Sequence, residues 1–233
     1  MNNPDKQPRL LLFDIDGTLV GTRTGIGRKA LEEAVHQVVG KRVQIPLRMC
    51  AGRTDPNIVD SALELILEPR THDLCDRILK QYVINLESLY QAGPDAFLQA
   101  GVLPLLEVLA ARSDIRLALL TGNILEGARI KLQAFNIWRF FPVGAYGGDN
   151  RNRSELPPIV IDRAQRHWSC VFDRRQTYVI GDTIHDIDAG KAHGLVTIAL
   201  GTHKEFIPEL KAANPDYFLK SMDPKEAFLR IIE

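Results

Sequence analysis

The sequence has few cysteines and no excess of charge of either sign. Its 233 residues include 3 cysteines, Cys50, Cys75 and Cys170, which lack the spacing of a metal site. They are typical of free thiols in a reducing compartment, so we expect a cytoplasmic protein. Lysine plus arginine equals aspartate plus glutamate, at 29 each. This balance removes the electrostatic basis for binding nucleic acid or a membrane surface.

Long apolar runs and a secretion signal are also missing. No apolar run approaches the length of a membrane span. The start, MNNPDKQPRL, lacks the charged-then-apolar order of a signal peptide. With 45% hydrophobic and 25% charged residues, the chain has an ordinary globular composition and suits one large or two smaller domains. We therefore expect neither a nucleic-acid nor a membrane partner, and no feature indicates an oligomeric state.

Short, nearly continuous apolar runs alternate with helical patterns along much of the chain. The runs predict strands that are covered on both faces: Arg9–Phe13, Ile115–Leu120, Thr177–Ile180 and Leu195–Leu200. The periodicity between and after them predicts helices at Val102–Arg112, Ile124–Phe135, Ile159–His167 and Asp186–Ala192. Alternation of this kind predicts an α/β fold built on a parallel sheet.

The alternation stops between residue 21 and about residue 101, where we expect no strand. The pattern there predicts helices at Gly25–Val39, Asp55–Leu67 and Thr71–Gln91. Asp55 has the features of an N-cap, with proline next, and the Gly93-Pro94 pair predicts a helix end. About 80 residues of helix are too many for a simple crossover.

We therefore predict two domains. The α/β core comprises residues 1–20 and 96–233, and an all-helical domain, residues 21–95, is inserted into it. The insertion follows the first strand directly, so it should lie over the carboxyl end of that strand. Ligands bind at this edge in open α/β sheets.

Polar side chains follow three of the predicted strands. Asp14 and Asp16 come after the first strand, Thr121 after the second, and Asp182 and Asp186 after the third. The carboxyl ends of parallel strands share one edge, so we expect these side chains to converge. Several carboxylates together repel unless a divalent cation neutralises them. Oxygen ligands without His or Cys favour Mg²⁺, and such a site usually indicates phosphate chemistry.

These motifs resemble those of the haloacid dehalogenase (HAD) superfamily. The residues concerned are DIDGTLV over residues 14–20, Thr121 after a strand, and GDTIHD over residues 181–186. Their order and spacing are similar to the phosphoglycolate-phosphatase-like branch, and the likeness covers nearly the whole chain. It implies a Rossmann-like core with an inserted, mobile helical cap.

The resemblance implies separate roles for the acidic residues. Asp14 matches the nucleophile that becomes an aspartyl phosphate, and Asp16 the general acid and base. Asp14, Asp182 and the backbone carbonyl of Asp16 match the Mg²⁺ ligands. Asp186 would be a further ligand, bound directly or through water.

The phosphate-binding group implied by the resemblance includes Thr121, whose hydroxyl would hold phosphoryl oxygens with neighbouring backbone N–H groups such as that of Gly122. The family usually carries a lysine before the last acidic motif, and here the matching region is RNRSELPPIVIDRA. Arg153 falls at the lysine position, and Arg151 is the alternative. A guanidinium there would contact both the phosphoryl oxygens and the nucleophile.

The segment CAGRTDPN, residues 50–57, is the most loop-like part of the predicted cap. Related proteins use a cap loop that reaches the active site, so Arg53 or Thr54 is expected to meet the leaving group or a second anionic group of the substrate. The alternative is a helix-start loop with a surface arginine. Asn123 is expected to cap the following helix rather than to touch substrate.

The predicted activity is Mg²⁺-dependent hydrolysis of a small phosphorylated metabolite: a phosphoglycolate-like compound, a sugar phosphate or a nucleotide. Asp16 favours a phosphate ester, because an alkoxide leaving group needs a proton and a halide does not. A phosphomutase of the β-phosphoglucomutase type would use the same core residues. A phospho-accepting signalling module is a remote alternative, because such modules lack the Asp-x-Asp-Gly-Thr motif and the helical insertion.

Overall fold

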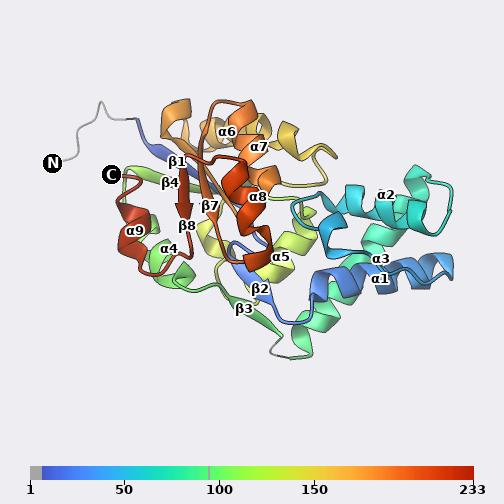
Figure 1. Cartoon of the computed structure of the whole chain (residues 1–233). Coiled ribbons are helices and arrows are strands. Elements are labelled where there is room, and N and C mark those ends of the chain that lie inside the picture. Colours follow the sequence, from blue (N-terminus) through green and yellow to red (C-terminus); the bar gives the residue numbers. More distant parts are fainter. Residues whose placement is uncertain (1–6, 94) are drawn as a thin grey trace.

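The computed structural model describes residues 7–93 and 95–233. A parallel sheet lies at its centre (Figure 1). Its strand order is β5-β4-β1-β6-β7-β8. The strands are β1 (Arg9–Phe13), β4 (Ile115–Leu120), β5 (Val143–Ala145), β6 (Thr177–Gly181), β7 (Val196–Leu200) and β8 (Tyr217–Leu219). The four predicted strands and the α/β fold class are confirmed. The edge strands β5 and β8 were not predicted.

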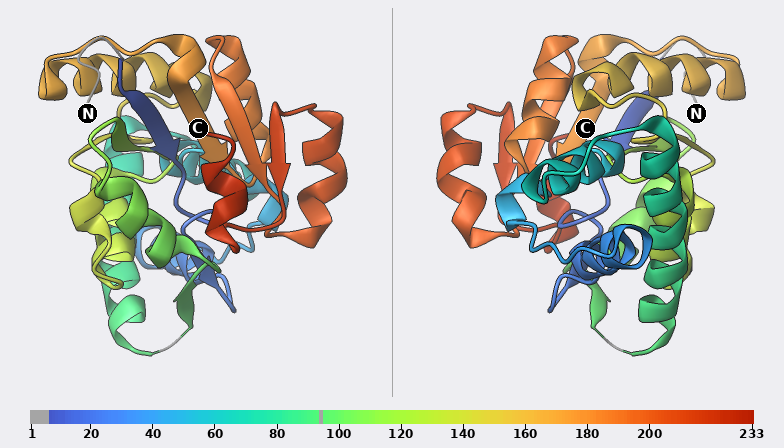
Figure 2. Two further views of the ribbon diagram at one scale, coloured as in Figure 1. Left: turned by 90° about the vertical axis from the view of Figure 1, so that its left-hand side faces the viewer. Right: turned by 90° about the vertical axis from the view of Figure 1, so that its right-hand side faces the viewer.

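Helices cover both faces of this sheet (Figure 2). They are α4 (Val102–Ala110), α5 (Leu125–Gln133), α6 (Leu156–Trp168), α7 (Ile184–Ala192), α8 (Ile207–Ala212) and α9 (Lys225–Leu229). The predicted helices correspond to α4 to α7, with ends that differ by a few residues. Short 3₁₀ turns are η1 (Leu47–Met49), η2 (Trp138–Phe140), η3 (Arg153–Glu155), η4 (Arg174–Gln176) and η5 (Lys204–Phe206).

The central strand β1 shows why its sequence is apolar throughout. Successive side chains of a strand point to opposite faces. Leu11 and Phe13 pack in the cluster that includes α4, α5 and α9, whereas Leu10 and Leu12 pack against α6. All of these side chains are fully buried. With both faces covered, the strand has no solvated position until it ends, just before Asp14.

The remaining helices form a unit with its own hydrophobic cluster, beyond the carboxyl edge of the sheet (Figure 1). They are α1 (Ile26–Val39), α2 (Asp55–Leu65) and α3 (His72–Gln91). The helix α3 ends just before Gly93, as expected, while Pro94 lies outside the described residues. The N-cap prediction for Asp55 is wrong by one position, because Thr54 is the N-cap and Asp55 begins the helix.

The expectation of no strand between residues 21 and 101 is also wrong. The strands β2 (Val20–Thr22) and β3 (Ala96–Leu98) pair antiparallel where the chain enters and leaves the helical unit. Each has only three residues, too few to show a period, and their pairing joins segments far apart in sequence. In the described part of the chain, no helix is long and apolar enough to cross a membrane. The cysteines are unpaired.

Candidate active site

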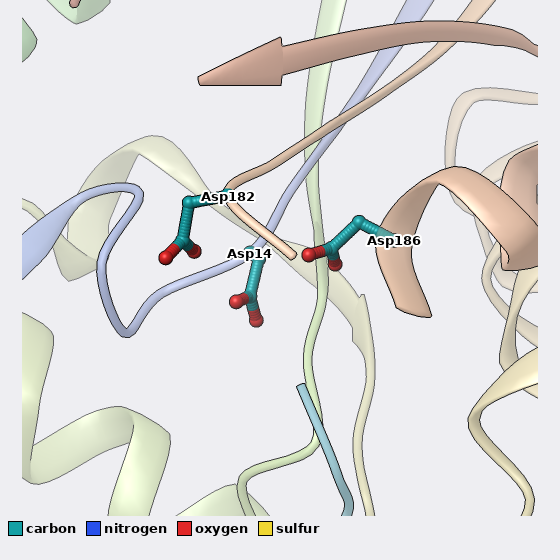
Figure 3. A group of neighbouring side chains, drawn as sticks. All are labelled: Asp14, Asp182 and Asp186. Carbon is teal, nitrogen blue, oxygen red and sulfur yellow. The ribbon is translucent and has the colours of Figure 1, made fainter. Parts of the chain in front are cut away.

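Three carboxylates meet at the carboxyl edge of the sheet. Asp14 follows β1, Asp182 follows the neighbouring strand β6, and Asp186 lies in the first turn of α7 (Figure 3). Each is buried, and one carboxylate oxygen of each lies within 4.8 Å of the others. The predicted convergence of these strand ends is therefore present in the structure. The side chain of Asp16 does not belong to this cluster.

The surroundings of the cluster disfavour the charged form of its carboxyl groups. Burial raises the pKa of Asp14 to about 6, against the opposing effect of Arg153. Burial and then the charge of Asp14 hold the pKa of Asp182 well above its usual range. One guanidinium, that of Arg153, contacts the cluster and leaves two of its negative charges uncompensated among the described residues. An all-oxygen donor set with this surplus charge fits a divalent hard cation such as Mg²⁺.

Gly17 lets the two loops approach each other. Its φ is +83°, and a Cβ at this position would lie 2.1 Å from Oδ2 of Asp182. A side chain is therefore excluded by both backbone conformation and space. Next to it, the Oγ1 of Thr18 donates a hydrogen bond of 3.1 Å to Oδ1 of Asp182. The Gly-Thr pair of the first motif thus sets the position of an acid from the third.

Arg153 is the basic residue that lies at the cluster. Its Nη2 is 3.0 Å from Oδ1 of Asp14, and it also bonds Asp186. Its side chain is only 6% exposed, and its Nε has no hydrogen-bond partner among the described residues. The alternative, Arg151, turns away and pairs with Asp60 instead. Of the two arginines, Arg153 is thus the one that contacts Asp14.

Asp16 is held by a lysine that the sequence analysis missed. Nζ of Lys131 lies 2.8 Å from Oδ1 and 2.6 Å from Oδ2 of Asp16. The side-chain amide of Asn123 donates to Oδ2 at 2.7 Å, and its Oδ1 accepts from Lys131 at 2.5 Å. A sequence signal exists, because Lys131 falls on the buried face of α5 with Gly127 and Ala128.

The predicted helix cap by Asn123 is wrong. The helix α5 begins at Leu125 and its N-cap is Ile124. The N–H of Ile124 donates to Oδ2 of Asp55 at 2.8 Å, so a carboxylate from the helical unit occupies the end of α5 instead. This arrangement leaves the Asn123 side chain free for Asp16 and Lys131.

The loop after β4 lies beneath the loop at residues 50–55. Thr121 is fully buried, and its Oγ1 accepts from the Asn123 side-chain amide at 2.9 Å. Gly122 accepts from the N–H of Asp55 at 2.7 Å, and a Cβ on Gly122 would lie 2.0 Å from the carbonyl oxygen of Arg53. The helical unit is thus seated directly on the strand end from which Thr121 comes.

A cavity of about 440 Å³ lies between the sheet edge and the helical unit. Its wall includes Asp14, Asp16 and Asp182 on one side and Arg53 on the other. The side chain of Thr54 is fully buried, and its Oγ1 donates to the Arg151 carbonyl at 2.9 Å. Of the two predicted substrate residues, Arg53 therefore lines the cavity, with its Nη1 3.5 Å from Oγ of Ser61, and Thr54 is occupied by a structural hydrogen bond.

Comparison with known proteins identifies the class. Residues 8–194 match the family of haloacid dehalogenase-like hydrolases, and the chain belongs to that family. The family resemblance read from the sequence is confirmed.

The chain is also similar to individual members. It is 26% identical over 222 residues to the pyrophosphatase PpaX of Halalkalibacterium halodurans, covering 91% of this chain and 92% of that protein. It is 24% identical over 222 residues to phosphoglycolate phosphatase of Haemophilus influenzae, covering 91% and 93%. A solved hydrolase from Pseudomonas syringae has the same fold, with a TM-score of 0.75, 18% identity and coverage of 97% and 100%.

The contact at Gly122 gives a stability prediction. A Gly122→Ala substitution places a Cβ against the Arg53 carbonyl and should lower the free energy of unfolding by about 1–3 kcal/mol, because overpacking forces the backbone to shift. A Gly148→Ala substitution is the matched control, since its Cβ would meet nothing closer than 3.9 Å. Chemical denaturation of both variants checks this, and equal stability would contradict the close packing.

Proposed function

We propose that this protein is a Mg²⁺-dependent phosphatase that hydrolyses a small phosphomonoester through an aspartyl phosphate on Asp14. The observation that carries the proposal is the placement of Asp14. Its carboxylate lies in the wall of the cavity, beside a guanidinium and two further acids. The family membership supports the same reaction class, since the chain is a HAD-like hydrolase.

The donor set suits the ion. In this proposal the carboxylates of Asp14, Asp182 and Asp186 and the backbone carbonyl of Asp16 hold Mg²⁺. When bound, the ion neutralises surplus charge in the cluster and polarises the phosphoryl group.

The reaction has two steps, formation of the aspartyl phosphate and its hydrolysis, and residues of the chain serve both. An Asp14 oxygen attacks phosphorus and forms an O–P bond, while the bond to the leaving oxygen breaks and that oxygen takes a proton from Asp16. Asp16 then takes a proton from water, whose oxygen attacks the same phosphorus and releases phosphate and the free Asp14 carboxylate. Arg153, which lines the cavity, balances the charge of Asp14 and offers its guanidinium to a phosphoryl oxygen.

The substrate is a small phosphorylated metabolite in this proposal, because the cavity of about 440 Å³ is closed on one side by the helical unit. We assign residues 21–95 as the cap and residues 1–20 and 96–233 as the catalytic core. Arg53 is the cap residue that meets the leaving group or a second anionic group. Phosphoglycolate-like compounds, sugar phosphates and nucleotides are the candidates, and the names of two relatives, a pyrophosphatase and a phosphoglycolate phosphatase, favour small phosphates.

Loss of the nucleophile tests the reaction. Asp14→Asn should lower Mg²⁺-dependent release of inorganic phosphate from a panel of phosphorylated metabolites by at least about 10³-fold, because the amide cannot form the intermediate. Asp73→Asn, at a position whose side chain is 81% exposed, is the matched control and should retain activity. Turnover by Asp14→Asn at the wild-type rate would refute the assignment. A doubly phosphorylated sugar in place of free phosphate would favour the phosphomutase.

The raised pKa values give a pH prediction for the metal-free protein. The folded state holds a proton on Asp14 up to about pH 6, whereas an ordinary carboxyl has a pKa of 3.8. The folded state therefore binds more protons at Asp14 in this window, and the contribution of Asp14 to stability should fall as pH rises from about 4 to about 7, by on the order of 2 kcal/mol.

Thermal unfolding with a chelator across this range measures the effect, and Asp14→Asn should show a smaller change. Added Mg²⁺ should raise the Tm more at pH 7.5 than at pH 5.5, because the ion competes with protons for the carboxylates. A wild-type protein that gains stability relative to Asp14→Asn as pH rises from 4 to 7 would contradict the prediction.

Arg53 is expected to select the substrate rather than to perform the chemistry. Arg53→Ala should raise KM for a metabolite with a second anionic group by about 10-fold or more, since a charge-assisted hydrogen bond is worth roughly 1.5–3 kcal/mol. Hydrolysis of 4-nitrophenyl phosphate should change little. Arg77→Ala, at an exposed site on α3, is the control. Equal losses on both substrates would count against a role in selectivity.

A further inference from the structure

We propose that Lys131 is the positioning residue of Asp16 and that, with Asn123, it leaves Oδ1 of Asp16 as the atom that gives and takes the proton. This inference rests on the proposed phosphatase reaction. It specifies which oxygen of Asp16 exchanges the proton and which residue positions that carboxylate. No other part of the proposal assigns a role to either residue.

Lys131 and Asn123 hold the Asp16 carboxylate in one orientation. The Asp16 side chain is 48% exposed at the cavity, where a carboxylate would otherwise turn freely. Lys131 contacts both of its oxygens, and Asn123 contacts Oδ2. Since Lys131 and Asn123 also bond each other, the three side chains form a closed ring of hydrogen bonds. The ring fixes the rotation of the carboxylate as well as its place.

The two oxygens of Asp16 accept different numbers of hydrogen bonds. A carboxylate oxygen offers about two lone-pair sites. Oδ2 of Asp16 accepts from both Lys131 and Asn123, whereas Oδ1 accepts from Lys131 alone among the described residues. The remaining site for a proton is therefore on Oδ1. A proton on this atom can pass to the leaving oxygen and later be replaced from water.

Lys131 carries its charge in a buried position. Lys131 is 4% exposed, and a buried ammonium needs a partner. Its Nζ finds that partner in Asp16, 2.6 Å from Oδ2, and also bonds Oδ1 of Asn123. It acts through Asp16.

Lys131 is buried because helices of the cap lie against its ammonium group. A Cβ on Gly27 of α1 would lie 3.5 Å from Nζ of Lys131 and 3.8 Å from the Tyr82 hydroxyl of α3. The ammonium thus lies where α5 of the core meets two helices of the cap. Asp16, at the cavity, is its ion-pair partner.

The test compares two esters that differ in the basicity of the leaving group. Phenyl phosphate needs a proton on its leaving oxygen far more than 4-nitrophenyl phosphate does. Lys131→Met should lower the rate of enzyme phosphorylation by phenyl phosphate by about 10²-fold or more, the usual contribution of general acid catalysis. With 4-nitrophenyl phosphate the variant should show a fast burst of nitrophenolate and then slow turnover, because water attack still needs the base.

Coupling to Asp16 separates positioning from a structural role. In the Asp16→Asn background, adding Lys131→Met should cause no further loss of activity, because the lysine acts only through that carboxylate. Lys131→Arg should restore part of the activity on phenyl phosphate, and Asn123→Ala should show the same ester-dependent loss in weaker form. Lys80→Met, an exposed site on α3, is the control. If Lys131→Met does not fold, Lys131→Arg and Asn123→Ala carry the comparison.

The outcomes distinguish the two proposals. Equal losses in the rate of enzyme phosphorylation by the two esters, or additive losses in the double variant, would overturn the role of Lys131 while leaving the phosphatase intact. A wild-type protein that releases no phosphate from either ester with Mg²⁺, or that keeps its activity in Asp14→Asn, would instead overturn the phosphatase reaction itself.

Discussion

The burial of three carboxylates against one guanidinium is the interaction on which the rest of the site depends. Strand ends bring Asp14 and Asp182 together because β1 and β6 are neighbours in a parallel sheet. Removing such groups from water is costly unless charge and hydrogen bonds compensate. Arg153, Thr18 and the capping interaction of Asp186 with Thr183 supply part of this compensation. In the proposed function, the remaining negative charge is what a bound divalent cation neutralises.

The two acids of the first motif illustrate how surroundings assign different work to identical side chains. Asp14 is buried among like charges, whereas Asp16 is half-exposed and paired with an ammonium. In the proposed mechanism, one forms a bond to phosphorus and the other moves protons. Only Ile15 separates the two acids in the sequence. They can still have different surroundings because the chain turns at this point, with Gly17 in the left-handed region.

The sequence predicted the parts of the fold in which local pattern and burial agree. β1 and β4 have the predicted bounds because their runs are apolar from end to end. Short strands such as β5, of three residues, depend on pairing partners that a local pattern cannot show.

The residues of the candidate site also fall into those that a local sequence pattern predicts and those that it does not. Asp14 and Asp182 were found because they follow strands. Lys131 was missed because a lysine is normally exposed, and its burial becomes evident only when Asp16, 115 residues away, is placed beside it. Arg153 was found by resemblance, since nothing in its local sequence distinguishes it from Arg151.

The small β2–β3 ladder has a consequence for how such a molecule can diversify. It pairs Val20 with Leu98, so the two ends of the intervening segment stay adjacent, about 5 Å apart as strand neighbours are. A segment with adjacent ends can be lengthened, shortened or exchanged without shifting the residues on either side of it. Under the proposed mechanism, changes within this one segment can therefore alter substrate preference, while the residues assigned to phosphoryl transfer keep their positions.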